Sequence, residues 1–296
     1  MEKDIVSTYH PIIEFAYFVC MIVFSVIFLH PLMLAASFAG AFAYAVFLDG
    51  KKTVKLWAKW LLPLTAAVTV INPLFNHYGE TILGYFRGNP ITEESIIYGV
   101  ISGVMFSTVI LWCRCYNAVM SSDKFMYIFG RVTPHLSLVF SMVLRFIPKF
   151  RRQIAVVSKA QECIGREASS GSIVKRARRG MKILSIMTTW ALEDAVGTSD
   201  SMRSRGYGLG GRTAYSIYRF DTRDAVIAAV MFAAAAAVIA GGVLGINTLT
   251  YYPAVKYAEI SASTAPVYAA YVLLCFGPVI LNGREAVKWR HLQSRI

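Results

Sequence analysis

The chain has 296 residues, of which 56% are hydrophobic and 16% are charged, and its mean hydropathy is +0.52. Because an average soluble domain carries about 25% charged residues, this composition argues against a disordered, a collagenous or an ordinary soluble protein. The formal net charge of +13 would suit nucleic-acid binding, but the placement of the basic residues indicates a different cause. The five cysteines lack the spacing of a disulfide framework or a zinc site, so we expect small buried hydrophobic residues.

Six apolar runs have the length or composition expected of a membrane-spanning helix. In chain order they are Ile12–Leu29, Pro31–Leu48, Trp60–Phe75, Ser95–Cys113, Ala225–Ile246 and Ala265–Leu281. The third run is short, but Trp57 and Trp60 give it an interfacial aromatic anchor. Glu14 is the only acidic residue within a run, and its place near the start favours an interfacial carboxylate over a proton- or ion-binding site.

Small residues and one proline mark where these predicted helices pack and end. The GxxxG pair Gly99–Gly103 and the small pair Ala36–Gly40 would each let two helix backbones approach closely, although small residues are common in spanning helices. Asn72-Pro73 is expected to end or kink the third run.

Lysine and arginine gather in three segments, which hold 27 of the 30 basic residues. Residues 49–59 hold four, residues 114–223 hold 19, and the tail after Leu281 holds four. With six spans all three segments fall on one side of the membrane, and the positive-inside rule makes that side the cytoplasm. We therefore expect a multi-pass protein of the cell membrane with both termini cytoplasmic. The same rule explains the net charge without nucleic acid.

The sequence between the fourth and fifth runs is too long for a simple loop and predicts a cytoplasmic region of about 110 residues. The chain is thus divided into a membrane part at residues 1–120, this region at 121–223 and a second membrane part at 224–296. The apolar stretch Leu136–Ile147 is too short to span a membrane. It predicts an interfacial helix with Arg145 reaching to the surface, and Pro148 is expected to break or bend the chain after it.

Two amphipathic helices are predicted after Pro148, because apolar residues recur there at helical spacing. The first covers Arg151–Ala168 and the second about Met181–Arg205, separated by a Gly/Ser break and a basic loop at Lys175–Arg179. The overall prediction is an all-α membrane protein with about six transmembrane helices and two long cytoplasmic helices. An amphipathic hairpin on the lipid surface is the alternative for this region.

The sequence carries no recognised catalytic or cofactor motif. Residues Gly206–Gly211 satisfy GxGxxG, but no predicted strand precedes them, so a helix-ending turn is the better interpretation. Walker A, HExxH and GxSxG patterns are absent, and the five histidines have no metal-ligand spacing. We therefore expect neither an enzyme nor a protein that holds its own cofactor or metal.

Arg166 and Arg205 are the most distinctive polar residues, since each stands beside glycine at the end of a predicted amphipathic helix. An arginine in that place can project beyond the helix and donate two hydrogen bonds to a carboxylate on a partner protein. Alternatively, each is a solvated charge that stabilises the C-terminal end of its helix.

Several ordered motifs resemble the transmembrane T component of energy-coupling factor (ECF) transporters, the EcfT or CbiQ-like family. Leu136–Pro148 resembles the segment before that family's coupling helices. Gly165-Arg166-Glu167 resembles its first Ala-Arg-Gly-type coupling motif, with glycine in place of alanine and glutamate in place of glycine. Ser201–Tyr207 closely resembles the second coupling motif, and Arg212–Tyr215 with Asp224 resembles the positions that follow it.

The resemblance implies a scaffold subunit of an ABC-class importer for a vitamin or a metal ion. In this family two coupling helices dock on two ABC ATPase subunits, which bind the ATP. The membrane part holds a separate substrate-binding S component, which sets the substrate. The residues that the resemblance places at the ATPase contact are Gly165, Arg166, Glu167, Ser204, Arg205 and Gly206.

Two other classes of protein stay open as alternatives. A stand-alone permease or channel would be expected to carry polar or ionisable residues in several spans, and these spans have almost none. A membrane-bound lipid enzyme would need a catalytic cluster at the cytoplasmic face, and the sequence offers none.

Overall fold

The computed structural model describes residues 4–86, 89–132, 134–165, 172–207, 209, 218–245, 249, 251–252 and 264–293. The chain divides into two compact units, of which one comprises Met1–Phe125 with Tyr218–Ile296 and the other Met126–Ile217. The first unit contains the apolar helices, and the second contains the two long amphipathic helices.

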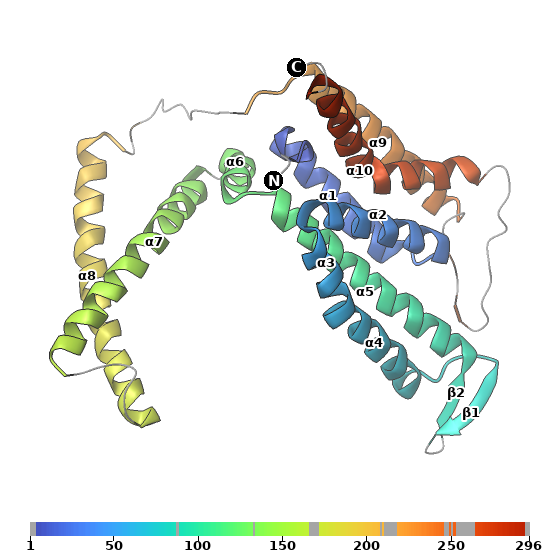
Figure 1. Ribbon diagram of the computed structural model, residues 1–296, viewed down its shortest axis with the longest axis horizontal. Coiled ribbons are helices and arrows are strands. Elements are labelled where there is room, and N and C mark those ends of the chain that lie inside the picture. The colour runs from blue at the N-terminus through green and yellow to red at the C-terminus, as the bar shows by residue number, and fades with distance from the viewer. Residues whose placement is uncertain are drawn as a thin grey trace. The chain divides into compact units, whose positions relative to one another are not determined.

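The first unit is a helical bundle with one small hairpin (Figure 1). Its elements are α1 (Pro11–Ile27), α2 (Pro31–Asp49), α3 (Lys51–Leu56), α4 (Leu62–Phe75), β1 (Ile82–Phe86), β2 (Asn89–Thr92), α5 (Glu93–Val119), α9 (Thr222–Val243) and α10 (Ala265–Gln293). A π-helical turn, Trp57–Leu61, joins α3 to α4. The helix α6 (Ser122–Val132) follows α5 and contains the division between the two units.

Five helical segments among the described residues are long and apolar enough to cross a membrane. They are Pro31–Asp49, Lys51–Phe75, Glu93–Val119, Thr222–Val243 and Ala265–Trp289. The remaining predicted span is α1, which is equally apolar but only 17 residues long. The prediction of an all-α multi-pass membrane protein is confirmed. The predicted start of the third span, Trp60, is too late in the sequence. The helical segment starts at Lys51 and continues through Trp57 and Trp60.

Glycines set the closest helix contacts, as the small-residue pairs predicted. A Cβ atom on Gly99 or Gly103 would lie 3.0 Å or 2.9 Å from a backbone carbonyl oxygen of α4, so these two glycines let α4 and α5 approach closely. A Cβ atom on Gly40 would lie 2.6 Å from the carbonyl oxygen of Cys275, so a glycine also lets α2 and α10 approach closely.

Aromatic residues and buried hydroxyl groups hold the centre of the bundle together. Trp112 of α5 is fully buried, and its indole N–H donates to Ser37 Oγ of α2 at 2.9 Å. Ser37 in turn shares a 2.8 Å hydrogen bond with Ser25 of α1. Three helices are therefore joined by one polar chain inside an apolar core, which satisfies groups that would otherwise be costly to bury.

Glu14 is not the interfacial carboxylate that the sequence predicted. It is 2% exposed, and Lys124 Nζ lies 2.8 Å from each of its carboxylate oxygens. Lys124 also donates to the carbonyl oxygens of Ser7 and Val119. The carboxylate is buried because a cation from α6, 110 positions later in the sequence, pairs with it, and that partner leaves no local signal.

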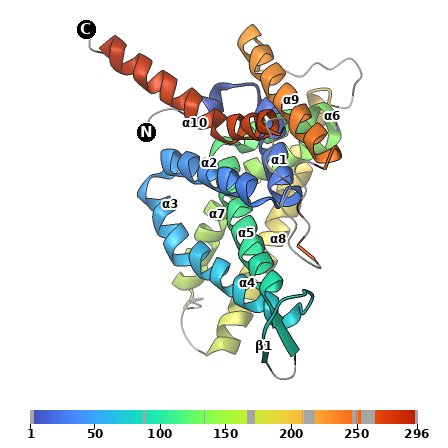
Figure 2. The same ribbon diagram turned by 90° about the vertical axis from the view of Figure 1, so that its right-hand side faces the viewer.

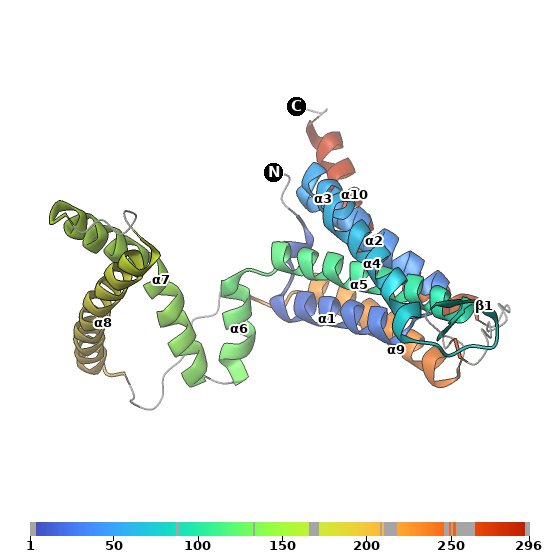
Figure 3. The ribbon, with the colours of Figure 1, turned by 90° about the horizontal axis from the view of Figure 1, so that it is seen from below.

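The hairpin of β1 and β2 was not predicted. Its strands pair antiparallel and lie at the end of α4 and α5 that is remote from the N-terminal segment (Figures 2 and 3). Thr92 ends β2 and caps α5, since its Oγ1 accepts from Ser95 N at 3.4 Å and donates to the Tyr78 carbonyl at 2.9 Å. The strands are only five and four residues long, too short for a clear alternating pattern.

The second unit is built from α7 (Pro134–Cys163) and α8 (Ile173–Ser204), which cross each other (Figure 1). Of the predicted break or bend at Pro148, the break is wrong, because α7 continues through it and joins the predicted Leu136–Ile147 helix to the first amphipathic helix. Proline removes one helical hydrogen bond, but packing persists on both sides. Phe146 and Phe150 stack edge to face with centroids 6.2 Å apart, and Phe150 meets Trp190 of α8 at 5.4 Å.

The basic stretch Lys175–Arg179 was predicted as a loop, and this is also wrong. It lies in the first turns of α8, which begins after Ser172 in an extended conformation. Lysine, arginine and alanine are all good helix formers, so a run of positive charge here did not indicate a break in the helix.

Candidate functional site

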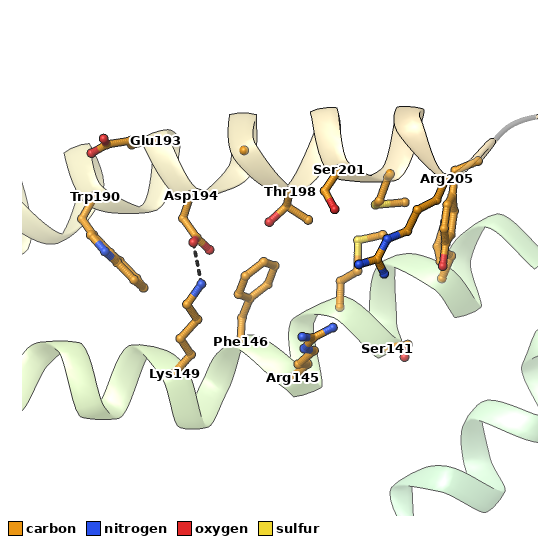
Figure 4. A pocket seen from close by; sticks show the side chains of 15 residues that line it. Ser141, Arg145, Phe146, Lys149, Trp190, Glu193, Asp194, Thr198, Ser201 and Arg205 are labelled. Atoms are coloured by element: carbon orange, nitrogen blue, oxygen red, sulfur yellow. Dashed lines mark hydrogen bonds and ion pairs between the residues drawn. The ribbon is translucent and has the colours of Figure 1, made fainter.

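Aromatic and charged contacts fix α8 against α7. Lys149 Nζ of α7 lies 2.5 Å from Asp194 Oδ1 of α8 and 5.4 Å from the centroid of the Trp190 ring (Figure 4). The lysine side chain is half exposed, so the ion pair itself contributes about 0–1 kcal/mol. The ring contacts of Trp190 therefore contribute more than the ion pair to holding the two helices in register.

A groove of about 890 Å³ runs between α7 and α8. Near one end Arg145 of α7 and Arg205 of α8 point towards one another (Figure 4). Ser141, Thr198 and Ser201 add hydroxyl groups to the lining. In the part of the chain that the structure describes, neither arginine forms an ion pair, so two guanidinium groups remain available to an anionic partner.

The end of α8 is a Schellman turn built by Ser204-Arg205-Gly206. Gly206 has a φ of +72°, a left-handed conformation that favours glycine. Its N–H donates to the Arg203 carbonyl at 3.0 Å, and Tyr207 N–H donates to the Met202 carbonyl at 3.1 Å, as that turn requires. Arg205 is the C-cap residue and is exposed. The sequence motif therefore works as a helix stop that presents an arginine at the helix end.

The end of α7 repeats part of this arrangement. α7 stops at Cys163, five residues before the predicted Ala168, and Gly165 has a φ of +75°. Gly165 N–H donates to the Glu162 carbonyl at 2.9 Å. Arg166 and Glu167 lie outside the described residues. Both long helices thus end at a left-handed glycine. This end was predicted for α8 but not for α7, whose helix was expected to continue to Ala168.

The sequence model of the CbiQ family, described as cobalt transport protein, matches residues 3–215. This chain belongs to the CbiQ cobalt transport protein family. The matched range covers every helix from α1 to α8 and both glycine-ended helices. Together with the five long apolar helices, membership of the CbiQ family makes this chain a multi-pass membrane protein.

Individual relatives of this CbiQ-family chain are named "Energy-coupling factor transporter transmembrane protein EcfT". The one from Bacillus selenitireducens is 35% identical over 114 residues, which are 38% of this chain and 42% of the relative. The one from Brevibacillus brevis is 34% identical over 182 residues, 58% of this chain and 68% of the relative. The one from Staphylococcus aureus is 25% identical over 251 residues, 76% of this chain and 92% of the relative. The match to the Bacillus protein, like that to the Lactobacillus helveticus protein, spans less than half of the relative.

Sequence reasoning found the two motif ends but missed the groove between the helices. It treated Arg145 as a side chain reaching to the membrane surface, whereas in the structure it points into the groove opposite Arg205 (Figure 4). Lys149, Trp190 and Asp194 were not singled out. A lysine one turn after Arg145 on the same helix face was the available signal, since residues four apart lie on one side of a helix.

Proposed function

We propose that this chain is the T component of an ECF importer. In this role it couples ATP hydrolysis by two partner ABC ATPases to reorientation of a separate S component, which binds a vitamin or a metal ion. The observation that carries the proposal is the end of α8, where a Schellman turn presents an exposed arginine with no acidic partner among the described residues. The family match and the separate two-helix unit support the same role.

The coupling step depends on Arg205 and, by sequence, on Arg166. A guanidinium at a helix end can donate a bidentate pair of hydrogen bonds to a partner carboxylate. The contacts of Trp190 with Phe150 and Lys149 tie α8 to α7, so a push at either helix end moves both helices together. The chain itself performs no chemistry in this role, because the ATP is bound and hydrolysed by the partners.

The test is co-purification of the ATPases together with substrate uptake by the whole transporter. Truncating one member of a buried, hydrogen-bonded charge pair costs roughly 2–5 kcal/mol, or about thirty- to several-thousand-fold in affinity. We expect Arg205→Ala to lower the affinity for the ATPases by such a factor and Arg205→Glu to lower it further. The double variant Arg166→Ala with Arg205→Ala should abolish uptake. Arg176→Ala and Arg178→Ala are matched controls, because both residues are exposed on α8 and far along it from Arg205.

The control result decides the assignment. Exposed charges contribute about 0–1 kcal/mol, so the Arg176 and Arg178 variants should retain the ATPases and uptake. If the Arg166 and Arg205 variants behave like these controls while reaching the membrane, the two arginines are solvated helix-end charges and the coupling role is wrong.

A further inference from the structure

A second groove lies on the first unit, between α1, α9 and α10. Its volume is about 340 Å³, and its walls are mainly aliphatic, with Ile13, Ile227, Val230, Leu273 and Leu281 among them. α9 and α10 lie side by side in Figure 1, and α1 and α9 do so in Figure 3. Val230 and Leu273 are 51% and 49% exposed, so the groove opens at the outer surface of a membrane-spanning bundle.

The wall formed by α10 owes its shape to Gly277-Pro278. A Cβ atom on Gly277 would meet nothing within 4 Å, so the missing side chain leaves open space. Pro278 has no N–H, which leaves the Leu274 carbonyl without its helical donor. Tyr17 of α1 replaces that donor with a 2.8 Å hydrogen bond. The groove therefore keeps an apolar lining although the helix ladder is interrupted.

One end of the groove is cationic. Arg284 lines it there and forms no ion pair among the described residues. Arg223 stacks on Tyr9, another lining residue, with its guanidinium carbon 4.6 Å from the ring centroid. Glu14 also lines the groove, but its carboxylate is paired with Lys124. The two acids near Tyr9 do not neutralise Arg284 either. Asp224 accepts from Asp221 N in the cap of α9, and Glu285 is not part of the lining.

The length of the groove matches one leaflet of a bilayer. The eleven helical steps from Leu273 to Arg284 rise about 16 Å, and the hydrocarbon core of a bilayer is roughly 30 Å thick. Arg284 follows the apolar run that ends at Leu281, so it can meet a lipid phosphate where the acyl chain leaves the groove. We propose that this groove binds one anionic phospholipid, with an acyl chain along α10 and the phosphate at Arg284. The proposal requires only that the chain spans a membrane and is independent of the coupling role.

Native mass spectrometry of the purified full-length chain tests this, with dipalmitoyl phosphatidylglycerol, dipalmitoyl phosphatidylcholine and free glycerol phosphate as probes. We expect one molecule of phosphatidylglycerol to bind saturably and phosphatidylcholine to bind more weakly. Glycerol phosphate at equal concentration should not compete with phosphatidylglycerol. Arg284→Gln should lower the affinity for phosphatidylglycerol about fivefold and leave the affinity for phosphatidylcholine nearly unchanged. Gly277→Leu fills the groove and should weaken both lipids at least about tenfold, because several methylene groups lose their burial.

Matched controls lie on the same helix outside the groove. Gly283 also has open space around its Cα, so Gly283→Leu adds the same side chain elsewhere, and Lys288→Gln removes an exposed cation. Val230→Trp fills the groove from α9 if Gly277→Leu does not fold. The proposal is overturned if the groove-filling variant, folded and monodisperse, binds lipid like the parent, or if the controls weaken binding equally. Loss of a co-purifying polypeptide with unchanged lipid binding would assign the groove to a protein and also overturn it.

Discussion

The buried ion pair of Glu14 and Lys124 gives the sharpest prediction of stability. Lys124 is 7% and Glu14 2% exposed, and the ammonium lies 2.8 Å from both carboxylate oxygens and 2.7 Å from the Ser7 carbonyl. Lys124→Met keeps the aliphatic stem but leaves the carboxylate buried without its cation. Breaking a buried pair in this way costs about 3–5 kcal/mol. We expect the free energy of unfolding in detergent to fall by that amount, measured by denaturant titration with tryptophan fluorescence.

A double-mutant cycle and a second ion pair provide the controls. Glu14→Leu combined with Lys124→Met removes both charges, so most of the loss should be recovered, because no buried charge remains unpaired. Arg114 and Asp49 form a 2.7 Å pair that is only partly buried, with side chains 24% and 36% exposed. Arg114→Met should therefore cost about 0–1 kcal/mol. A Lys124→Met loss no larger than the Arg114→Met loss, or additivity in the cycle, would refute the reasoning.

The remaining predictions concern the helix stop, the source of energy and the topology. Gly206→Ala should weaken ATPase co-purification, because a side chain at a φ of +72° costs about 1–2 kcal/mol, whereas Gly180→Ala within α8 should leave it unchanged. The purified chain alone should hydrolyse no ATP, since the sequence has no Walker A motif, and hydrolysis by a subunit-free preparation would contradict the scaffold role. In a background without native cysteines, labelling should place residues 172–180 and the C-terminus in the cytoplasm and residues 80–86 outside. A C-terminus outside would contradict the six-span topology.

The parts of the fold that were predictable are those whose cause lies within one stretch of sequence. A long apolar run identifies a spanning helix by itself, and the GxxxG pair Gly99–Gly103 marks a close contact whichever helix supplies the partner. The motif Ser204-Arg205-Gly206 likewise contains its own helix stop, because the left-handed turn needs only the glycine. The end of α8 could therefore be predicted before its packing was known, whereas α7 was predicted to continue past Gly165.

Two of the errors, those at Glu14 and Arg145, have a different origin, since each depended on a partner that is remote in the sequence. Glu14 reads as an interfacial carboxylate until Lys124 is placed beside it. Arg145 reads as a side chain that reaches to the membrane surface until α8 brings Arg205 to the opposite side of the groove. For both residues the local pattern gives the charge but not the neighbour that decides whether the charge is buried, paired or left available.

The prolines show how a remote partner decides whether a proline ends its helix. Pro73 stands near a helix end, and α4 stops two residues later at Phe75. Pro148 and Pro278 occupy helix interiors, and both helices continue through them. At Pro278 the reason is explicit, because Tyr17 donates its hydroxyl proton to the Leu274 carbonyl that the proline leaves unpaired, from 257 positions away. Tyr17→Phe should therefore destabilise the bundle by about 1–3 kcal/mol through the unsatisfied carbonyl. Tyr17→Phe combined with Pro278→Ala, which restores the helical donor, should recover most of that loss in the same unfolding assay. If the double variant is no more stable than Tyr17→Phe alone, the tyrosine does not act through the proline.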